Sequence, residues 1–492
     1  MAMLRSLGRA VAPIRSALVG QHAAAVLSTV ANGSSPLRSC CIVGAGPGGF
    51  YTAKYLLKAD PDVRIDIVEQ LPTPFGLVRS GVAPDHQDVK SVQNDFTTVA
   101  EDERVRYFGN VSVGDGSRIT LEALREHYGA VVLAYGAEGD RELGIAGEDL
   151  AGVHAARAFV NWYNGHPDFV GLEPDLSCET ALIVGQGNVA VDCARILSKT
   201  PAELASSDIA RHAQEALSRS RIRRVVVAGR RGHVQASFTM KELRELTKLD
   251  GASFVVRDSE LEQGLTEASA HEISETRAKK RMDALLRKQA AVAPTCEEDS
   301  QRKALEIRFL LNPVEFLSDS ADIGRVGAAR MERTVLSGDP FEQSASGTGE
   351  YEELACGLVL RSIGYQSAPL ASALPFDDER AVVRNERGRV EPGLYCAGWV
   401  KRGPTGIIGT NIPDARETVE AIVGDAEAGV LSIGGEHSES PLVQLARDEQ
   451  SVVMWDGFRR IDQSECAAGA AQGKPREKIV DVLEMLRVAT AT

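Results

Sequence analysis

Short apolar runs that end in glycine-rich turns recur along this sequence. The four clearest are residues 39–43 (SCCIV), 64–68 (RIDIV), 180–184 (TALIV) and 224–228 (RVVVA). Continuous runs of this length are typical of parallel strands that are covered on both faces. Helical patterns follow the first and third runs, at residues 50–57 and 191–197. The order of strand, turn, helix and strand predicts an α/β fold built from parallel sheets.

The first turn is a G-x-G-x-x-G motif, GAGPGG, at residues 44–49. Gly44 allows a tight turn, Gly46 lets the backbone approach a pyrophosphate, and Gly49 lets the next helix pack closely against the strand. The helix N-terminus offers unpaired N–H groups and a partial positive charge to the phosphates. The next strand ends in Glu69, whose carboxylate can bind both hydroxyls of an adenosine ribose and would repel a 2′-phosphate. This turn predicts a site for NAD or FAD.

The second turn is G-x-G-x-x-A, from Gly185 to Ala190, and the strand after it is followed by Arg230 and Arg231. Two arginines stand where the first unit has its acid, and the planar guanidinium group matches phosphate oxygens. The pattern predicts a site for the 2′-phosphate of NADP. The long polar stretch 199–221 between turn and strand predicts an extra helix. Two sites of opposite preference suggest one permanent and one exchanging nucleotide, so we expect FAD in the first and NADPH in the second.

Three further apolar runs lie elsewhere in the chain, at residues 130–136, 356–364 and 393–398. The first two end in glycine and predict the points at which the chain crosses between two domains. The third leads into Trp399, a glycine-rich loop and a helical pattern to about residue 423. This loop predicts a segment that closes over the flavin, with the backbone amides of residues 406–408 facing its polar edge.

The charge of the chain is uneven. Its formal net charge is −14, which excludes a general nucleic-acid binder because such a protein needs a basic surface. No acidic residue precedes Asp60, whereas the first 38 residues carry four arginines and several serines. This pattern predicts a mitochondrial transit peptide over residues 1–38, with plastid targeting and a plain disordered tail as alternatives. No apolar run reaches the roughly 20 residues that a membrane helix needs.

The eight cysteines contain no C-x-x-C pair. Their spacing fits no zinc or iron–sulfur site and lacks the dithiol of thioredoxin-like chemistry. Most lie in apolar strand-like runs, where cysteine behaves as a small core residue. We therefore expect no metal site and no catalytic thiol.

Seven phrases, in this order, resemble the adrenodoxin reductase family of NADPH-dependent ferredoxin reductases: GAGPGGFYTA, PFGLVRSGVAPDH, GQGNVAVDCARIL, GRRG, FTMKELREL, GLYCAGWVKRGPTG and GKPREK. The resemblance runs from about Ser39 to Leu486. It implies two Rossmann-like dinucleotide-binding domains in a glutathione-reductase-like architecture, with the NADP-binding domain inserted into the FAD-binding domain. The expected FAD-binding domain covers residues 39–137 and 365–492, and the expected NADP-binding domain covers residues 138–364.

The motifs and the resemblance together assign the cofactor contacts. FAD contacts are expected at Gly44, Ala45, Gly46, Gly48, Gly49, Glu69, Leu77, Val113, Trp399, Gly406, Ile407 and Ile408. NADP contacts are expected at Gln186, Gly187, Asn188, Val189, Arg230, Arg231, Glu242 and Gly406. Leu77, Val113 and Glu242 are implied by the resemblance alone. The chain departs from the family pattern in two places: at Gly232-His233-Val234, where members often have proline, and by small differences in the loop IIGTNIPD after Gly406. Neither departure touches a residue with a clear chemical role.

The implied reaction is the oxidation of NADPH and the one-electron reduction of a [2Fe–2S] ferredoxin, twice, through FAD. The electrons would feed a mitochondrial cytochrome P450 or the biosynthesis of iron–sulfur clusters or haem. The resemblance places His86 and Glu245 near the cofactors as a candidate catalytic pair, with the capping of a turn as the alternative role of His86.

Three other functions fit the two nucleotide units less well. A flavin disulfide reductase needs paired cysteines, and a relative of the glutamate synthase small subunit needs an N-terminal cysteine cluster. A non-enzymatic FAD-binding redox sensor has no use for Arg230 and Arg231.

A ferredoxin of this type is usually acidic, and so is this chain. Four basic residues would share one face if residues 276–288 form a helix: Arg277, Lys280, Arg281 and Lys288. We expect this patch to attract the partner electrostatically. We also expect a monomer in the mitochondrial matrix, peripheral at most to the inner membrane.

Overall fold

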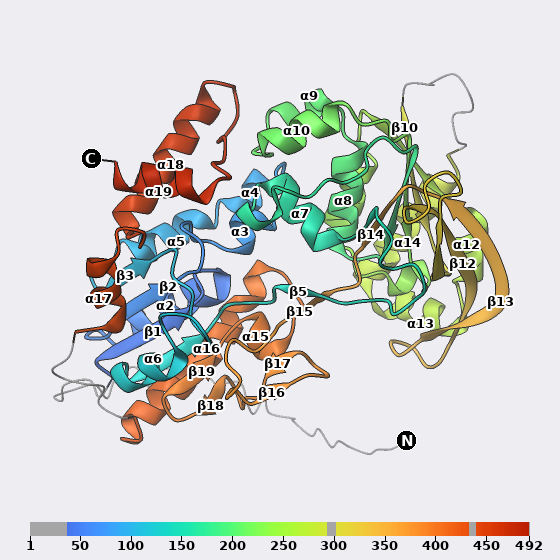
Figure 1. The fold of residues 1–492 in the computed structure, drawn as a ribbon. Helices are drawn as coiled ribbons and strands as arrows, with labels where there is room; N and C mark the ends of the chain where they lie inside the picture. The colour runs from blue at the N-terminus through green and yellow to red at the C-terminus, as the bar shows by residue number, and fades with distance from the viewer. Residues whose placement is uncertain (1–36, 293–301, 432–438, 492) are drawn as a thin grey trace, which may run out of the picture.

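The computed structural model describes residues 37–292, 302–431 and 439–491, so nearly all of the predicted transit peptide 1–38 lies outside the described residues. The described chain forms two lobes that lie side by side (Figure 1). Each lobe is built on a six-stranded sheet. All neighbouring strands in these sheets run parallel except β18 and β19. The predicted α/β fold with parallel sheets is confirmed.

The sheet of the first lobe has the order β18-β19-β4-β1-β2-β3. Its strands, in chain order, are β1 (Ser39–Val43), β2 (Arg64–Val68), β3 (Val105–Phe108), β4 (Ala130–Leu133), β18 (Arg389–Glu391) and β19 (Leu394–Cys396). Successive side chains of a strand point to opposite faces. In β1, Cys40 and Ile42 enter one apolar layer, and Cys41 and Val43 enter the other. This double burial explains why the strand reads as a continuous apolar run.

Helices cover both faces of this sheet. One layer contains α2 (Pro47–Ala59), α5 (Gln93–Ala100), α16 (Asn411–Glu427), α18 (Trp455–Ala470) and α19 (Val482–Thr490). The other contains α6 (Leu121–His127), α15 (Trp399–Arg402), α17 (Pro441–Asp448) and the short strands β16 (Phe376–Asp377) and β17 (Val382–Val383). Two short helices, α3 (Leu77–Ser80) and α4 (Gln87–Lys90), follow β2. They lie on the side of the lobe that faces its neighbour (Figure 1).

The sheet of the second lobe has the order β6-β14-β7-β8-β10-β9. Its strands are β6 (Val153–Ala155), β7 (Thr180–Val184), β8 (Arg224–Ala228), β9 (Ala252–Val256), β10 (Lys303–Arg308) and β14 (Leu358–Arg361). Its helices are α7 (Ala156–Asn164), α8 (Asn188–Ser198), α9 (Pro201–Ala205), α10 (Arg211–Ser218), α11 (Met240–Leu246), α12 (Asp258–Gln263), α13 (Glu267–Glu275) and α14 (Arg277–Ala290). The predicted extra helix in the polar stretch 199–221 is thus two short helices, α9 and α10.

A third, antiparallel sheet covers the outer end of the second lobe. It consists of β11 (Leu311–Ser318), β12 (Val326–Ser337) and β13 (Ser344–Ala355). The chain crosses between the lobes twice, and the crossings pair as the antiparallel strands β5 (Gly139–Asp140) and β15 (Tyr365–Gln366). The exact domain boundaries stay predictions. Within the described segments, no helix is both long and apolar enough to traverse a bilayer.

Candidate active site

A cleft of about 800 Å³ lies where the two glycine-rich turns face each other. From the first lobe, Gly46 and Glu69 line it, and from the second lobe, Asn188 and Val189 do. Both turns sit at the carboxyl ends of parallel strands, after β1 and β7. Ligands of open α/β sheets bind at this edge because helix N-termini converge there.

The first turn has the geometry that a phosphate cradle needs. Gly44 has a φ of +108°, and a Cβ on it would lie 2.6 Å from the carbonyl oxygen of Ala134. A Cβ on Gly49 would lie 2.1 Å from the carbonyl oxygen of Gly44, so helix and strand are in direct backbone contact. A Cβ on Gly46 would meet nothing within 4 Å and would point into open space. The backbone at Gly46 is therefore free to approach a pyrophosphate.

Glu69, at the end of β2, points back to this turn. Its carboxylate accepts hydrogen bonds from the backbone N–H of Ala45 at 3.0 Å and from that of Leu71 at 3.1 Å. Removal from solvent raises its pKa to about 7, although the N–H groups of Ala45 and Leu71 act in the opposite direction. The group lines the cleft, where two ribose hydroxyls could donate to its oxygens.

The late glycine-rich loop closes the first lobe's end of the cleft. Gly398 has a φ of +75°, and a Cβ on Gly48 would be 3.3 Å from the Gly398 Cα, so the two segments touch. Trp399 packs on Tyr365 with ring centroids 5.3 Å apart, and both rings line the cleft. Arg402 donates to the side chains of Thr410 and Asn411 and so fixes the loop that carries residues 406–408.

The second turn repeats the geometry of the first. Gly185 has a φ of +121°, and a Cβ on it would lie 2.1 Å from the carbonyl oxygen of Ser362. A Cβ on Gly187 would again meet nothing within 4 Å. The Asn188 side chain accepts from the backbone N–H of Thr239 at 2.8 Å. The Gln186 amide donates to the carbonyl oxygen of Arg308 at 2.8 Å and so points away from the cleft.

Arg230 and Arg231 follow β8 with exposed side chains. Their backbone carbonyls are fixed, because Thr334 Oγ1 donates to that of Arg230 at 2.6 Å and Leu310 N–H donates to that of Arg231 at 3.2 Å. Among the described residues, neither guanidinium group has an ion-pair partner. Two anchored, uncompensated arginines beside the second turn suit a phosphate monoester.

A cluster of charged side chains occupies the wall between the turns. His86 Nε2 lies 2.7 Å from Glu245 Oε2 and 3.9 Å from Glu242 Oε2. Arg195, which is 1% exposed, reaches both glutamates at 3.4 Å and Asp192 at 2.7 Å. Burial disfavours a charged imidazole, but the hydrogen bond to Glu245 and the negative charges of Asp192 and Asp85 together outweigh it and raise the pKa of His86. The expected His86–Glu245 pair is therefore formed, and its two members come from different lobes.

The predicted contact residues divide into three groups. Those that line the cleft are Gly44, Gly46, Gly48, Glu69, Leu77, Asn188, Val189, Glu242, Trp399, Gly406, Ile407 and Ile408, together with His86. Those that support or flank the turns without lining the cleft are Ala45, Gly49, Gln186, Gly187, Arg230 and Arg231. Val113 lies outside the cleft, where it pairs with Ile119 and packs on the apolar layer beneath α6. The basic residues Arg277, Lys280, Arg281 and Lys288 are exposed on α14, as expected.

Sequence reasoning missed three charged residues of this wall, namely Asp85, Asp192 and Arg195. Asp85 accepts two hydrogen bonds from Arg195, at 2.8 and 3.0 Å, and an ion pair from Lys199 at 2.6 Å. Asp192 lines the cleft one turn before Arg195 on α8. These residues lie in the phrases PFGLVRSGVAPDH and GQGNVAVDCARIL, but the sequence carries no signal that residues 110 positions apart would pair.

The residues present fit FAD and NADP. The first turn joins an open glycine cradle to a carboxylate, which suits a dinucleotide with a free 2′-hydroxyl. The second turn joins an open glycine cradle to two unpaired arginines, which suits a 2′-phosphate. The described cysteines are free thiols, and burial raises the pKa of Cys40, Cys41 and Cys193.

Comparison with known proteins shows the family to which the chain belongs. It matches the family model for pyridine nucleotide-disulphide oxidoreductases over residues 38–247. It is 47% identical over 473 residues to the mitochondrial NADPH:adrenodoxin oxidoreductase of Salvelinus fontinalis, covering 94% of this chain and 93% of that protein. It is 46% identical to the protein of the same name from Arabidopsis thaliana, and the match covers 93% of this chain and 96% of that protein. The structure of Mycobacterium tuberculosis FprA in complex with NADPH matches this chain with 41% sequence identity and a TM-score of 0.85. The match covers 92% of this chain and 100% of FprA. The chain therefore belongs to the adrenodoxin reductase family.

Proposed function

We propose that this protein is an FAD-containing NADPH:ferredoxin oxidoreductase that carries electrons from NADPH to a [2Fe–2S] ferredoxin. The observation that carries the proposal is that the two glycine turns, one with an acid and one with an arginine pair, flank one cleft. The names of the relatives, NADPH:adrenodoxin oxidoreductase and NADPH-ferredoxin reductase, support the same reaction.

The first lobe would hold FAD through the N-terminus of α2, the backbone at Gly46 and the Glu69 carboxylate. The second lobe would hold NADPH through the N-terminus of α8 and through Arg230 and Arg231. When bound, FAD supplies an acceptor for hydride and a donor of single electrons. Trp399 and Tyr365 give the cleft an aromatic wall. The two lobes together would align the two nucleotides, which lowers the entropic part of the barrier.

His86 holds a proton at the wall of the cleft. Its hydrogen bond to Glu245 spans the two lobes, and its raised pKa keeps the imidazole charged over more of the neutral range. A positive charge here would offset the negative charge that hydride brings into the cleft. Because no bond to substrate is made or broken at His86, we assign the pair an electrostatic and orienting role rather than a nucleophilic one.

The exposed face of α14 is the proposed docking surface for the ferredoxin. Among the described residues, Arg277, Lys280, Arg281 and Lys288 form no ion pair, whereas Arg287 on the same helix pairs with Glu262 and Asp283. α14 also packs against α11, the helix that carries Glu242 and Glu245. Unpaired basic residues on an acidic protein give a local field that attracts an acidic partner at low ionic strength.

We further propose that the protein works in the mitochondrial matrix as a monomer. The relatives named above from Salvelinus fontinalis and Arabidopsis thaliana are mitochondrial by name. Residues 1–38 contain arginines and no acidic residue, which supports a mitochondrial transit peptide. Attachment of a fluorescent protein after residue 38 should direct the reporter to mitochondria, and deletion of residues 2–38 from the full chain should abolish that import.

The test of the proposed activity is ferredoxin-dependent reduction of cytochrome c with NADPH or NADH as the donor. Arg230→Ala should raise the KM for NADPH about tenfold to a hundredfold, because hydrogen bonds to a charged group are worth about 1.5–3 kcal/mol, and should leave NADH unaffected. Arg221→Ala, which removes an exposed arginine upstream of β8, is the matched control. Equal use of NADH and NADPH by the unmodified protein would contradict the proposal.

A further inference from the structure

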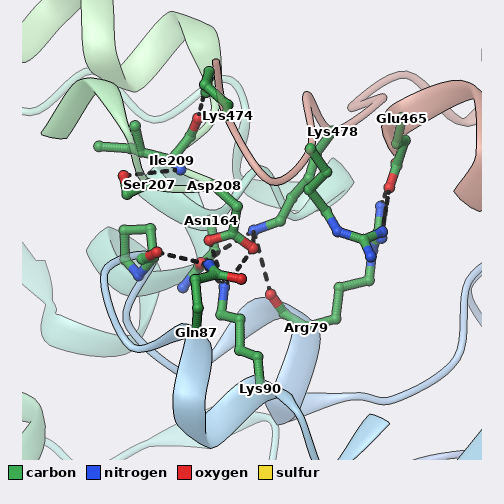
Figure 2. Close-up of polar contacts among 12 residues, drawn as sticks. Arg79, Gln87, Lys90, Asn164, Ser207, Asp208, Ile209, Glu465, Lys474 and Lys478 are labelled. Atoms are coloured by element: carbon green, nitrogen blue, oxygen red, sulfur yellow. Dashed lines mark hydrogen bonds and ion pairs between the residues drawn. The ribbon is translucent and has the colours of Figure 1, made fainter. Parts of the chain in front are cut away.

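A buried cluster of charged residues joins the two lobes beside the cleft, and the reaction proposed above does not use it. Asp208, which is 2% exposed, lies between α9 and α10 of the second lobe. Lys90 at the end of α4 binds both its carboxylate oxygens, at 2.7 and 2.8 Å. Lys478, from the chain between α18 and α19, lies 3.4 Å from the same carboxylate. Figure 2 shows the two lysines converging on Asp208 from different segments of the first lobe.

Further contacts tie the same segments together. Asn164, at the end of α7 in the second lobe, accepts from Lys478 at 3.2 Å and from Lys90 at 3.4 Å. Lys474 donates to the carbonyl oxygen of Ile209 at 2.9 Å, and Glu477 accepts from the backbone N–H of Arg211 at 3.3 Å. All of these bonds pass from the first lobe to the second. The phrase GKPREK, which contains the C-terminal members, thus acquires a structural role.

The cluster stabilises the fold only at a high desolvation cost. Two ammonium groups face one carboxylate, and burial lowers the pKa of both Lys90 and Lys478. Buried ion pairs often contribute less than apolar side chains of the same volume, because desolvation offsets their attraction. Their better-attested use is to select one arrangement among several. The arrangement selected here is that of the two lobes, since the side-chain contacts of Asp208 and Asn164 with the two lysines all cross between them.

The cluster is also one helical turn from the cleft. Lys90 follows His86 by four residues, and Val89 between them lines the cleft. Asn164 follows Asn161 by three residues on α7, and Asn161 lines the cleft as well. A shift at Asp208 would therefore be transmitted by rigid backbone to both walls of the cleft.

We propose that Asp208, gripped by Lys90 and Lys478, is a brace that fixes the orientation of the second lobe on the first and so positions NADPH against the flavin. The residues of the brace are positioning residues, because none of them touches the cleft. The proposal rests on the proposed function for what is positioned, but the contact between the lobes stands on the structure alone.

The test uses Lys478→Met in the FAD-loaded full chain. This variant should fold, because Lys90 still pairs one-to-one with Asp208. The control is Arg257→Met: Glu306, a buried carboxylate of the second lobe, is held by Arg224 at 2.6 Å and by the half-exposed Arg257 at 2.7 Å, so one of two cations on a buried carboxylate is removed within a single lobe. Lys90→Met is a second, reciprocal variant that leaves the Asp208–Lys478 contact.

Three quantities are measured for each protein. The first is the rate of flavin bleaching by NADPH without oxygen, which should fall about tenfold or more in both lysine variants, because misplacement by about an ångström costs up to a hundredfold. The second is the Kd of 2′,5′-ADP, which contacts the second lobe alone and should stay within twofold. The third is hydrogen exchange at the amides of Asp208 and Arg211, which bond to Pro84 and Glu477 of the first lobe and should exchange faster.

The brace is refuted if bleaching stays within twofold of the unmodified rate while exchange accelerates. It is also refuted if 2′,5′-ADP binding and FAD content fall in parallel with bleaching, or if Arg257→Met has the same effects. Failure of the unmodified protein to bleach with NADPH would instead overturn the proposed function, and unchanged exchange at Asp208 and Arg211 in the lysine variants would still overturn the brace.

Discussion

The Glu69 carboxyl should couple FAD binding to pH. In the protein without FAD its pKa is raised to about 7, so it is protonated over much of the acidic range. The ribose hydroxyls of FAD donate hydrogen bonds to the charged form, which lowers the pKa again. FAD must therefore displace a proton below pH 7, and its affinity should rise with pH up to about 7 and level off above.

The size of the pH effect on FAD affinity follows from the shift in the pKa of Glu69. If bound FAD returns the pKa of Glu69 to its ordinary value of 4.5, the pKa falls by about 2.5, and a difference of one in pKa corresponds to about 1.36 kcal/mol. The total is about 3.4 kcal/mol, or roughly 300-fold in Kd, spread between about pH 4.5 and 7. The steepest dependence is about tenfold per pH unit.

The assay is the quenching of FAD fluorescence on titration with FAD-free protein at a series of pH values. Glu69→Gln should bind FAD more weakly at pH 7.5 and should lose the pH dependence, because glutamine does not titrate. Glu138→Gln is the control, since Glu138 lines the same cleft and burial raises its pKa as well. This variant should keep the pH dependence, with its upper end moved to lower pH because the Glu138 charge contributes to the raised pKa of Glu69. A Kd that is flat from pH 5 to 7 in the unmodified protein, or an equal slope in Glu69→Gln, would refute the reasoning.

Three further predictions concern other parts of the molecule. Gly49→Ala should abolish FAD retention, measured as FAD content after purification, because the new Cβ would lie 2.1 Å from the Gly44 oxygen; full FAD content would contradict this. Arg195→Met should lower the free energy of unfolding by about 3–5 kcal/mol in urea denaturation, because it strips buried carboxylates of their partner; a loss under 1 kcal/mol would argue against a structural role. Arg277→Glu with Arg281→Glu should slow ferredoxin-coupled turnover at low salt and spare dye reduction; normal coupled turnover would exclude α14 as the docking face.

Four strands of the two six-stranded sheets could be predicted closely from the sequence, whereas β3, β6, β9, β10 and β18 were not predicted. The runs 39–43, 64–68, 180–184 and 224–228 match β1, β2, β7 and β8 residue for residue. A strand buried on both faces has to be apolar throughout, and the glycine turn after it marks its end. The third sheet was not predicted, because β13 (SASGTGEYEELA) is mostly exposed and polar and so carries no alternating or continuous apolar signal.

The site was predictable where a motif acts through its own backbone and less so where distant segments meet. The two glycine turns and Glu69 function within one strand–turn–helix unit, so spacing alone was informative. The partnership of Asp85 with Arg195, and that of Lys90 with Asp208, joins residues more than a hundred positions apart. Such pairs depend on how the lobes dock, and one sequence without its structure does not specify which lysine meets which aspartate.

Anaerobic mixing of the FAD-loaded protein with NADPH and, separately, with NADH tests the central claim most directly. The flavin colour should bleach rapidly with one equivalent of NADPH and far more slowly with NADH, because the second turn with Arg230 and Arg231 selects the 2′-phosphate and the shared cleft brings the two nucleotides together. No bleaching with NADPH, or bleaching at equal rates with both donors, would contradict the account.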